Sequence, residues 1–466
     1  MQFTKSQIIF LVIGGLIALI LALIALGLLP GLRYKEKVLT LTFWGVDDPR
    51  VWVSTIANFR TERPDLAISY RQIEEDKYEE ELIEAMTFGE GPDIFMFENN
   101  WLLKHGDKTI PAPASKMTLD NIEKLFPRVI RDDFVTNAGV YALPLYVDTL
   151  AMVYNRTLFD QGKIVFPPKT WEEVIEAISI LKIMNGDTIE RAAFALGGSS
   201  ENVVDAADII SAFMLQNGNT MVNNNLSGAT FAGAGGIEAF EIYTGFADSS
   251  DSSYTWNQSM PIDSEALVRE SVAAIFMYAE EAQDLEDRNS FLEMEVALLP
   301  QIDPNNEVNV ADYWGLTVSG VTRETNEIKA DIKKANAWDF VIYATTNEDM
   351  AASYMARTGH PPALKTLINE IIVTEKNTAA AHQAFKDRRP ALQTIINETL
   401  ANPNLAIFAS QALTARSWLQ PGEEPFAMAI NEAVEAVLSE NLKLTDALRQ
   451  AESIITRELQ STQWAG

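Results

Sequence analysis

The sequence predicts an α/β protein with two domains and one N-terminal transmembrane helix. Its 466 residues are enough for two domains of ordinary size. Short β-rich segments alternate with amphipathic helical segments along most of the chain, which is typical of α/β folds. The run Ile8 to Leu29 has no charged or polar side chain and would form a helix about 33 Å long, enough to cross a bilayer.

The apolar run has two interpretations. Small residues at Ala25 and Gly27 would suit a cleaved secretory signal, but the run is longer than the apolar core of such a signal. We therefore favour an uncleaved anchor. Only Lys5 precedes the run, whereas three basic residues follow it between positions 33 and 37, and this count alone would place the C-terminal side in the cytoplasm.

The composition argues against several classes of function. Lys and Arg number 36 against 65 Asp and Glu, and the net charge of −29 argues against a nucleic-acid partner, because phosphate binding needs basic side chains. The absence of cysteine excludes disulfides, thiolate metal sites, cysteine nucleophiles and a lipid-anchored cysteine. The three histidines, His105, His360 and His382, lie far apart in sequence, so we expect neither a metal site nor a cofactor.

The first predicted lobe begins with the alternating strand Val38 to Trp44. It continues with a helix (51–60), a strand (67–73), an acidic amphipathic helix (76–87) and a strand (89–97). Open α/β sheets bind ligands at the carboxyl ends of their strands. Trp44, Glu98, Asn99 and Trp101 stand at or just after such ends, so we expect them at a ligand site.

The stretch Tyr141 to Asn155, YALPLYVDTLAMVYN, predicts two adjoining strands with Asp148 between them. A carboxylate buried in such an apolar run costs free energy unless a partner compensates it. Asp148 therefore has two interpretations, a cap at the strand junction or a carboxylate presented to a cleft between lobes. Tyr146 would lie at the same place.

This stretch resembles the first lobe crossing in the solute-binding proteins of ABC importers, family 1, the maltodextrin-binding type. That family continues with LFD and PPKTWEE segments, which stand here at residues 158–160 and 167–173. The likeness runs in order over roughly residues 38–460. It has two departures, the missing lipid-anchor cysteine and the pair Glu270 and Ser271 near a position where the family usually has glycine. The resemblance implies the type II periplasmic-binding-protein fold, with a ligand cleft between its lobes.

The second half of the chain is assigned by pattern and by this resemblance. We expect a helix at 171–184 and strands at 192–196, 273–278 and 311–319. The resemblance places Tyr278 at the cleft and Trp314 with Gly315 nearest the ligand. Arg357, in the hinge loop, would bind an anionic group or brace the hinge.

The implied division of the chain follows from crossings expected near 146–149, 301–310 and 344–358. Residues 1–35 would be the anchor and linker. The first lobe would comprise 36–147 and 306–350, and the second lobe 148–305 and 351–466.

Sugar recognition combines stacking on aromatic rings with hydrogen bonds to polar and charged groups. Four of the nine tryptophans fall where this fold would place the cleft. The predicted ligand-binding residues are Trp44, Glu98, Asn99, Trp101, Tyr146, Asp148, Trp256, Tyr278, Trp314, Gly315 and Arg357.

The resemblance implies a non-enzymatic receptor that closes on a solute and delivers it to the permease subunits of an ABC transporter, with carbohydrate as the expected ligand. A single span at Ile8 to Leu29 would hold it in the cell membrane with the large domain outside, opposite to the orientation given by the basic-residue count. Two alternatives stay open, a tethered sensor for a signalling partner and a secreted glycosidase with Asp93 and Asp148 as its carboxylate pair. Asp93 has a simpler interpretation as a turn residue before a strand.

Overall fold

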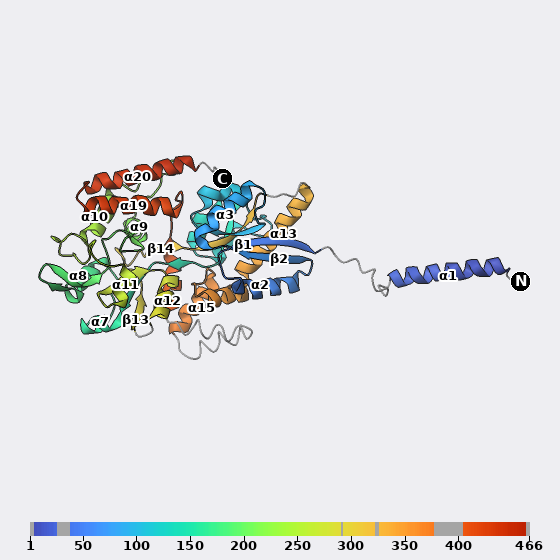
Figure 1. Cartoon of the computed structure of the whole chain (residues 1–466), viewed down its shortest axis with the longest axis horizontal. Coiled ribbons are helices and arrows are strands. Elements are labelled where there is room, and N and C mark those ends of the chain that lie inside the picture. The colour runs from blue at the N-terminus through green and yellow to red at the C-terminus, as the bar shows by residue number, and fades with distance from the viewer. Residues whose placement is uncertain (1–3, 26–37, 290–291, 322–325, 377–403, 463–466) are drawn as a thin grey trace.

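The computed structural model describes residues 4–25, 38–289, 292–321, 326–376 and 404–462. Helix α1 (Lys5–Ala25) stands N-terminal to an α/β body (Figure 1). Within these ranges, no helix is both long enough and apolar enough to cross a membrane. The last residues of the expected span, 26–29, lie outside the described ranges.

The first lobe is built on a six-stranded mixed sheet. The strand order is β2, β1, β3, β15 and β4, and β7 also pairs with β15. Strands β1, β2 and β3 run parallel, whereas β15 is antiparallel to β3, β4 and β7. The bounds are β1 (Leu39–Gly45), β2 (Leu66–Gln72), β3 (Ile94–Glu98), β4 (Thr109–Ile110), β7 (Ala142–Pro144) and β15 (Trp314–Ser319).

Helices surround this sheet, and their ends follow from local sequence. Asp48 caps α2 by accepting a hydrogen bond from the Arg50 N–H, and Pro49 stands in the first turn, where its missing N–H costs nothing. Tyr78, Leu82 and Met86 form the buried stripe of α3. The helices of this lobe are α2 (Pro49–Glu62), α3 (Glu75–Thr87), α4 (Leu102–His105), α5 (Leu119–Leu125), α6 (Arg128–Phe134), α13 (Glu327–Thr346), α14 (Glu348–Thr358) and α15 (Lys365–Lys376).

The second lobe contains a five-stranded sheet in the order β10, β11, β12, β9 and β13. Its strands are β9 (Ala151–Asn155), β10 (Ile183–Asn185), β11 (Thr188–Phe194), β12 (Val272–Met277) and β13 (Met294–Ala297). Its helices are α7 (Arg156–Gln161), α8 (Trp171–Leu181), α9 (Ala206–Gln216), α10 (Ala234–Gly245), α11 (Asp263–Val268), α12 (Ala279–Arg288), α18 (Asn404–Gln411), α19 (Glu423–Leu438) and α20 (Leu444–Ser461). Helices α19 and α20 pack side by side along one edge of this lobe (Figure 1).

A three-stranded sheet joins the lobes. Strand β14 (Asn309–Asp312) lies between β8 (Asp148–Thr149) and β16 (Ala415–Arg416). We call this unit the junction sheet. A separate hairpin pairs β5 (Val135–Thr136) with β6 (Gly139–Val140).

Each lobe has its own hydrophobic core. The first core combines residues from 41–147 with others from 311–368 and from 409–415, and the second combines Leu103 and residues from 150–310 with Phe408 and others from 426–459. Ala344, Ala352 and Leu367 belong to the first core. The third crossing therefore lies at β16 rather than at 344–358, and α14 and α15 pack with the first lobe, although residues from 351 onward were expected in the second.

The expected strand 89–97 begins only at Ile94, as β3, and two further expected elements differ in ways that change the path of the chain. The expected helix 171–184 ends at Leu181, because Gly186 adopts a positive φ and closes a hairpin that pairs 183–185 with 188–191. The expected single strand 311–319 is two strands, β14 and β15, separated by Tyr313. The chain thus leaves the junction sheet and enters the first lobe at Tyr313.

Candidate functional site

The candidate site lies where the lobes meet. In the junction sheet Asp148 pairs with Asp312, and in the first lobe Trp314 pairs with Glu98 at the end of β3. The backbone N–H of Ala279, just after β12, donates to the Asp148 carboxylate. Strand ends from both lobes therefore surround the junction, as expected for ligand sites of open sheets.

Asp148 caps a helix of the second lobe. Its carboxylate accepts hydrogen bonds from the N–H of Thr149 at 2.7 Å and from that of Ala279, the first residue of α12, at 2.9 and 3.1 Å. Burial raises the pKa of Asp148 to about 7, and these N–H groups act in the opposite direction. Because both carboxylate oxygens of Asp148 accept hydrogen bonds from backbone N–H groups, the structure favours the interpretation of Asp148 as a cap.

Trp101 and Trp314 meet inside the first core. Their ring centroids lie 5.4 Å apart, and Tyr78 stacks on Trp101. Trp101 is only 3% exposed and Trp314 only 6%, so they present little ring surface to a solute. Trp44 is half-buried, and the Arg71 guanidinium lies 4.5 Å from the centroid of its ring.

Close packing around position 315 explains why this residue is glycine. A Cβ at this position would lie 2.6 Å from the carbonyl oxygen of Leu143 and 2.9 Å from the Phe134 ring. Strand β15 pairs with β7 at this position, and only glycine fits without a shift of the backbone.

Trp256 lies in the second core and is fully buried. The preceding Thr255 anchors it, because its hydroxyl accepts hydrogen bonds from the N–H of Ala193 and Phe194 in β11. Trp256 thus packs as a core residue of the second lobe.

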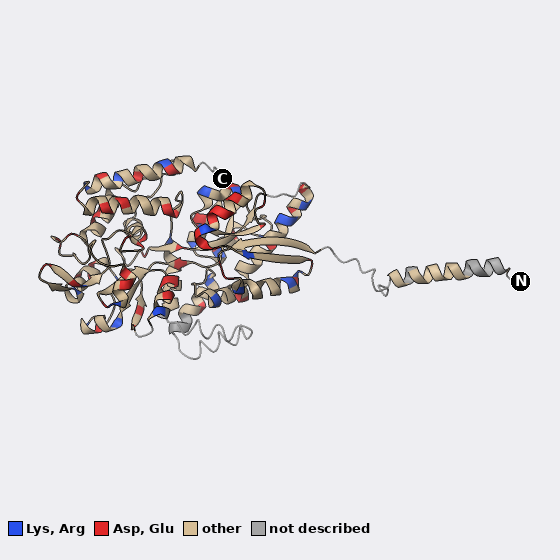
Figure 2. Ribbon diagram, viewed as in Figure 1, with Lys and Arg blue, Asp and Glu red and all other residues tan. Residues whose placement is uncertain are grey.

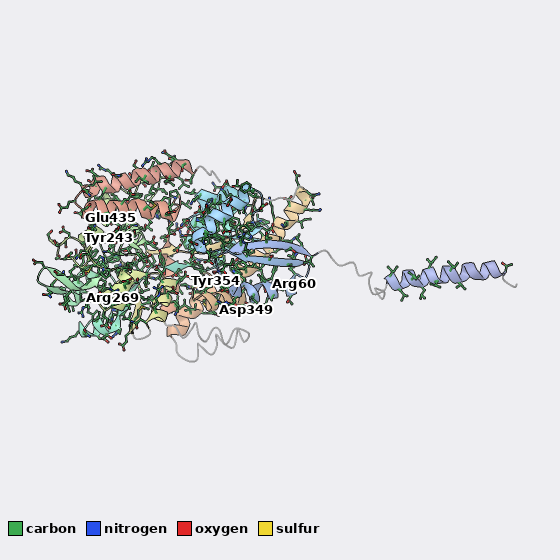
Figure 3. The ribbon with its side chains drawn as sticks, viewed as in Figure 1. Arg60, Tyr243, Arg269, Asp349, Tyr354 and Glu435 are labelled. Atoms are coloured by element: carbon green, nitrogen blue, oxygen red, sulfur yellow. The ribbon has the colours of Figure 1, made fainter. Side chains whose placement is uncertain are left out.

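An aromatic stack lies next to β8 of the junction sheet. Tyr146 and His360 lie parallel with ring centroids 3.8 Å apart, and Tyr354 of α14 stacks on the other members of the group. The Tyr354 hydroxyl donates to the Asp47 carboxylate at 3.2 Å (Tyr354 is labelled in Figure 3). Arg357 is exposed in the last turn of α14.

Glu98 and Asn99 remain at the end of β3. Glu98 is half-buried, and burial, followed by repulsion from Glu423 and Glu79, raises its pKa to about 8. Asn99 is buried, its N–H donates to the carbonyl of Tyr313, and its Oδ1 has no hydrogen-bond partner among the described residues. Contact of any predicted side chain with a ligand stays a prediction.

Sequence reasoning missed a set of carboxylates around the junction. Burial raises the pKa of Asp47 to about 7 and the pKa of Glu280 to about 6, and it also raises the pKa of Asp312. Repulsion from neighbouring carboxylates adds to each of these shifts. Several of these carboxylates stand in the first turn of a helix that follows a strand. This position in the sequence pattern could have identified them. The set comprises Asp47, Glu75, Asp205, Asp208, Glu280, Glu281, Asp312 and Glu423, and it lies around the predicted Glu98. Figure 2 shows acidic positions along α3 and on α19.

The carboxylate pair of the alternative glycosidase interpretation, Asp93 and Asp148, is not assembled. Asp93 accepts hydrogen bonds from Thr42 at 2.8 and 2.9 Å and forms an ion pair with Lys333 at 2.7 Å. It lies beside Ser319 at one end of β15, whereas Asp148 pairs with Asp312 beyond the other end. Strand β15 is roughly 20 Å long, which exceeds the spacing of catalytic carboxylates.

The described part of the chain contains no group of three or more metal-ligating side chains close enough to hold a metal ion. His382 lies outside the described residues.

Comparison with known proteins places this geometry in context. The family described as bacterial extracellular solute-binding protein matches residues 47–351. A maltotriose-binding protein of Pyrococcus abyssi is 23% identical over 343 residues, which cover 69% of this chain and 65% of that protein. A relative from Brucella abortus is 22% identical over 190 residues, which cover 41% of this chain and 44% of that protein. The chain therefore spans less than two thirds of the length of these relatives.

Two solved structures share the fold. The cyclic α-maltosyl-1,6-maltose-binding protein of Arthrobacter globiformis is 15% identical, with a TM-score of 0.70 over 91% of this chain and 99% of that one. The sugar-binding protein of Xanthomonas citri is 18% identical, with a TM-score of 0.70 over 91% and 98%. At these identities the likeness establishes the two-lobed fold.

Proposed function

Since the chain belongs to the bacterial extracellular solute-binding proteins, we propose that it is a receptor that closes its two lobes on a small carbohydrate. The observation that carries the proposal is the junction sheet, around which strand ends of both lobes bring carboxylates together. Relatives and structural neighbours named for maltotriose or cyclic maltosyl-maltose binding support carbohydrate as the ligand class.

The mechanism is hinge closure about the junction sheet. The lobes have separate cores, so they can move as units while β8, β14 and β16 absorb the change in backbone angles. Asp148 connects β8 to α12, so this part of the junction sheet moves with the second lobe. The solute shifts an equilibrium between open and closed forms towards the closed form.

Delivery and location belong to the same proposal. The closed form docks on the permease subunits of an ABC transporter, and the apolar run Ile8 to Leu29 anchors the receptor in the cell membrane with the lobes outside. The family match supports the extracytoplasmic side. A protease added to intact cells should remove the lobes if they lie outside and leave them intact if they lie inside.

A screen of thermal stability tests the ligand class. The full chain would be heated with monosaccharides, maltodextrins, amino sugars, amino acids and polyamines. A ligand at about 100 times its Kd should add about 2.7 kcal/mol to the free energy of unfolding. A shift with a saccharide supports the proposal, and shifts only with amino acids or polyamines contradict it.

A further inference from the structure

Asp133 is a buried carboxyl group without a cationic partner. It lies in α6 of the first lobe and is only 2% exposed. The two arginines of this helix pair with other acids, Arg128 with Asp132 and Arg131 with Glu123. Among the residues that the structure describes, no Lys or Arg forms an ion pair with Asp133. A charge on this group therefore depends on hydrogen bonds for its stabilisation.

Two hydroxyl groups donate hydrogen bonds to this carboxyl group. The Tyr313 hydroxyl donates to Oδ2 at 2.6 Å, and the Ser417 hydroxyl donates to Oδ1. Tyr313 stands between β14 and β15, where the chain enters the first lobe. Ser417 directly follows β16. Asp133 is therefore bonded to residues that adjoin two of the three strands of the junction sheet.

The hydrogen bond to Ser417 lies at a passage between the lobes. Ala415, before Ser417, belongs to the first core, whereas Trp418 and Leu419, after it, pack against the second core. The chain thus passes from the first lobe to the second at Ser417, and Asp133 holds this passage against α6. A movement of the second lobe that carries Ser417 with it would break the hydrogen bond and admit water to the carboxyl group.

The charge of Asp133 would favour this separation. Burial raises the pKa of Asp133 to about 7, whereas an exposed aspartate has a pKa of about 4. Between these two pH values the bonded arrangement keeps a proton that the separated arrangement has lost, so the bonded arrangement becomes less favourable as pH rises. Above about pH 7 both arrangements are ionised, and the balance between them changes no further.

The elements packed against α6 carry few other charges. Strands β5 and β7 have no charged residue. On α6 itself, repulsion from Asp132 raises the pKa of Asp133 further, whereas the hydrogen bonds from Ser417 and Tyr313 lower it. The charged residues on the other elements packed against α6, or next to Tyr313, are Asp120, Glu123 and Lys124 of α5, Arg416 of β16 and Asp312 of β14.

We propose that Asp133 is a proton-dependent latch of the hinge, which holds Ser417 against α6 when its carboxyl group is protonated and releases Ser417 when the group is ionised. A protonated carboxyl group both donates and accepts, so it can bond the two hydroxyl groups of Ser417 and Tyr313 without a buried charge. The inference rests on the proposed movement of the lobes, but it requires no particular solute.

The test is the distance between the lobes of the ligand-free full chain, measured by pulsed electron resonance with spin labels at Asp76→Cys and Glu241→Cys, which are exposed positions of different lobes. The distance distribution should be broader at about pH 7.5 than at about pH 5. Asp133→Asn cannot ionise and keeps a donor and an acceptor, so it should lose most of this pH response. Asp132→Asn, at an exposed position of α6, is the matched control and should retain it.

A second variant leaves Asp133 in place. Ser417→Ala removes the half-buried hydroxyl group at the other end of the hydrogen bond, so its distance distribution should be broad already at about pH 5. A wild-type distribution that does not change with pH, or a pH response of equal size in Asp133→Asn, would overturn the latch. The proposed function would then still stand if a saccharide changes the distribution. A response to pH that depends on Asp133, without a response to any saccharide, would support the latch and contradict the proposed function.

Discussion

The carboxylate of Asp148 accepts two hydrogen bonds from the backbone N–H of Ala279, at 2.9 and 3.1 Å. These atoms belong to different units, since Asp148 lies in the junction sheet and Ala279 opens α12 of the second lobe. The Asp148 side chain thus accepts hydrogen bonds from the N-terminus of α12 and links the junction sheet to the second lobe.

Replacing Asp148 should measure this connection. Asp148→Ala leaves the buried N–H groups of Ala279 and Thr149 without acceptors, so the free energy of unfolding should fall by about 1–3 kcal/mol. Asp148→Asn keeps one acceptor oxygen and should cost less. Urea denaturation of the three proteins tests this order, and an Asp148→Ala variant as stable as wild type would refute the capping role.

Gly315 offers a test of the packing of β15. Its Cβ would lie 2.6 Å from the Leu143 carbonyl, so Gly315→Ala should lower the free energy of unfolding by about 1–3 kcal/mol. Gly186→Ala is a poor control because Gly186 has a positive φ, whereas Gly228→Ala meets only side chains at 3.3 Å or more. Equal stability of the Gly315 and Gly228 variants would contradict the steric account.

Substitutions of Trp314 and Trp44 should distinguish an effect on stability from an effect on ligand binding. Trp314 packs against Trp101 and Tyr78 in the first core, so Trp314→Ala should destabilise the chain by about 3–5 kcal/mol. Trp44 is half-buried, so Trp44→Ala should cost less and report more directly on ligand contact. Paired denaturation and titration measurements check this, and a Trp314 variant of normal stability that no longer binds would show that Trp314 serves the ligand instead.

The stability of the ligand-free chain should fall as pH rises from about 6.5 to about 8. Burial raises the pKa of Glu98 to about 8 and that of Asp47, Asp133 and Asp148 to about 7. In this window the folded state therefore binds more protons than the unfolded state, and its stability decreases with pH. Burial lowers the pKa of His360 to about 4, so this side chain makes stability rise with pH. That effect is confined to pH values below about 6.5, the pKa of an unfolded histidine, and does not enter this window.

Urea midpoints at several pH values test this sign. Glu98→Gln removes the group that titrates last, so its stability should depend less on pH at the upper end of the window. Stability that rises with pH across the window would contradict the raised pKa values.

The sequence predicted much of the framework but less of the site. Strand periodicity located β1 and β3, and the Tyr141–Asn155 stretch contained the first crossing, because local patterns determine these elements. Tyr313 could not be identified as a crossing residue, since the resemblance implied one strand over 311–319 and no proline interrupts it. Trp256 fitted the cleft by order along the chain, but its neighbours in space place it in a core.

The carboxylates around the junction illustrate a different limit. Asp208 and Glu423 are more than 200 residues apart in sequence, and only the packing of α9 against α19 brings them to one cavity. In a chain of net charge −29, acidic residues are too common for any one of them to be identified as a site residue from sequence.

Lobe closure is the central claim, and an inter-lobe distance measures it most directly. The chain has no cysteine, so Asp76→Cys on α3 and Glu241→Cys on α10 would carry two spin labels at exposed positions of different lobes. Pulsed electron resonance of the full chain should show a changed, narrower distance distribution when the saccharide with the largest thermal shift is added. Saturated binding with an unchanged distribution would contradict a receptor that works by closing its lobes.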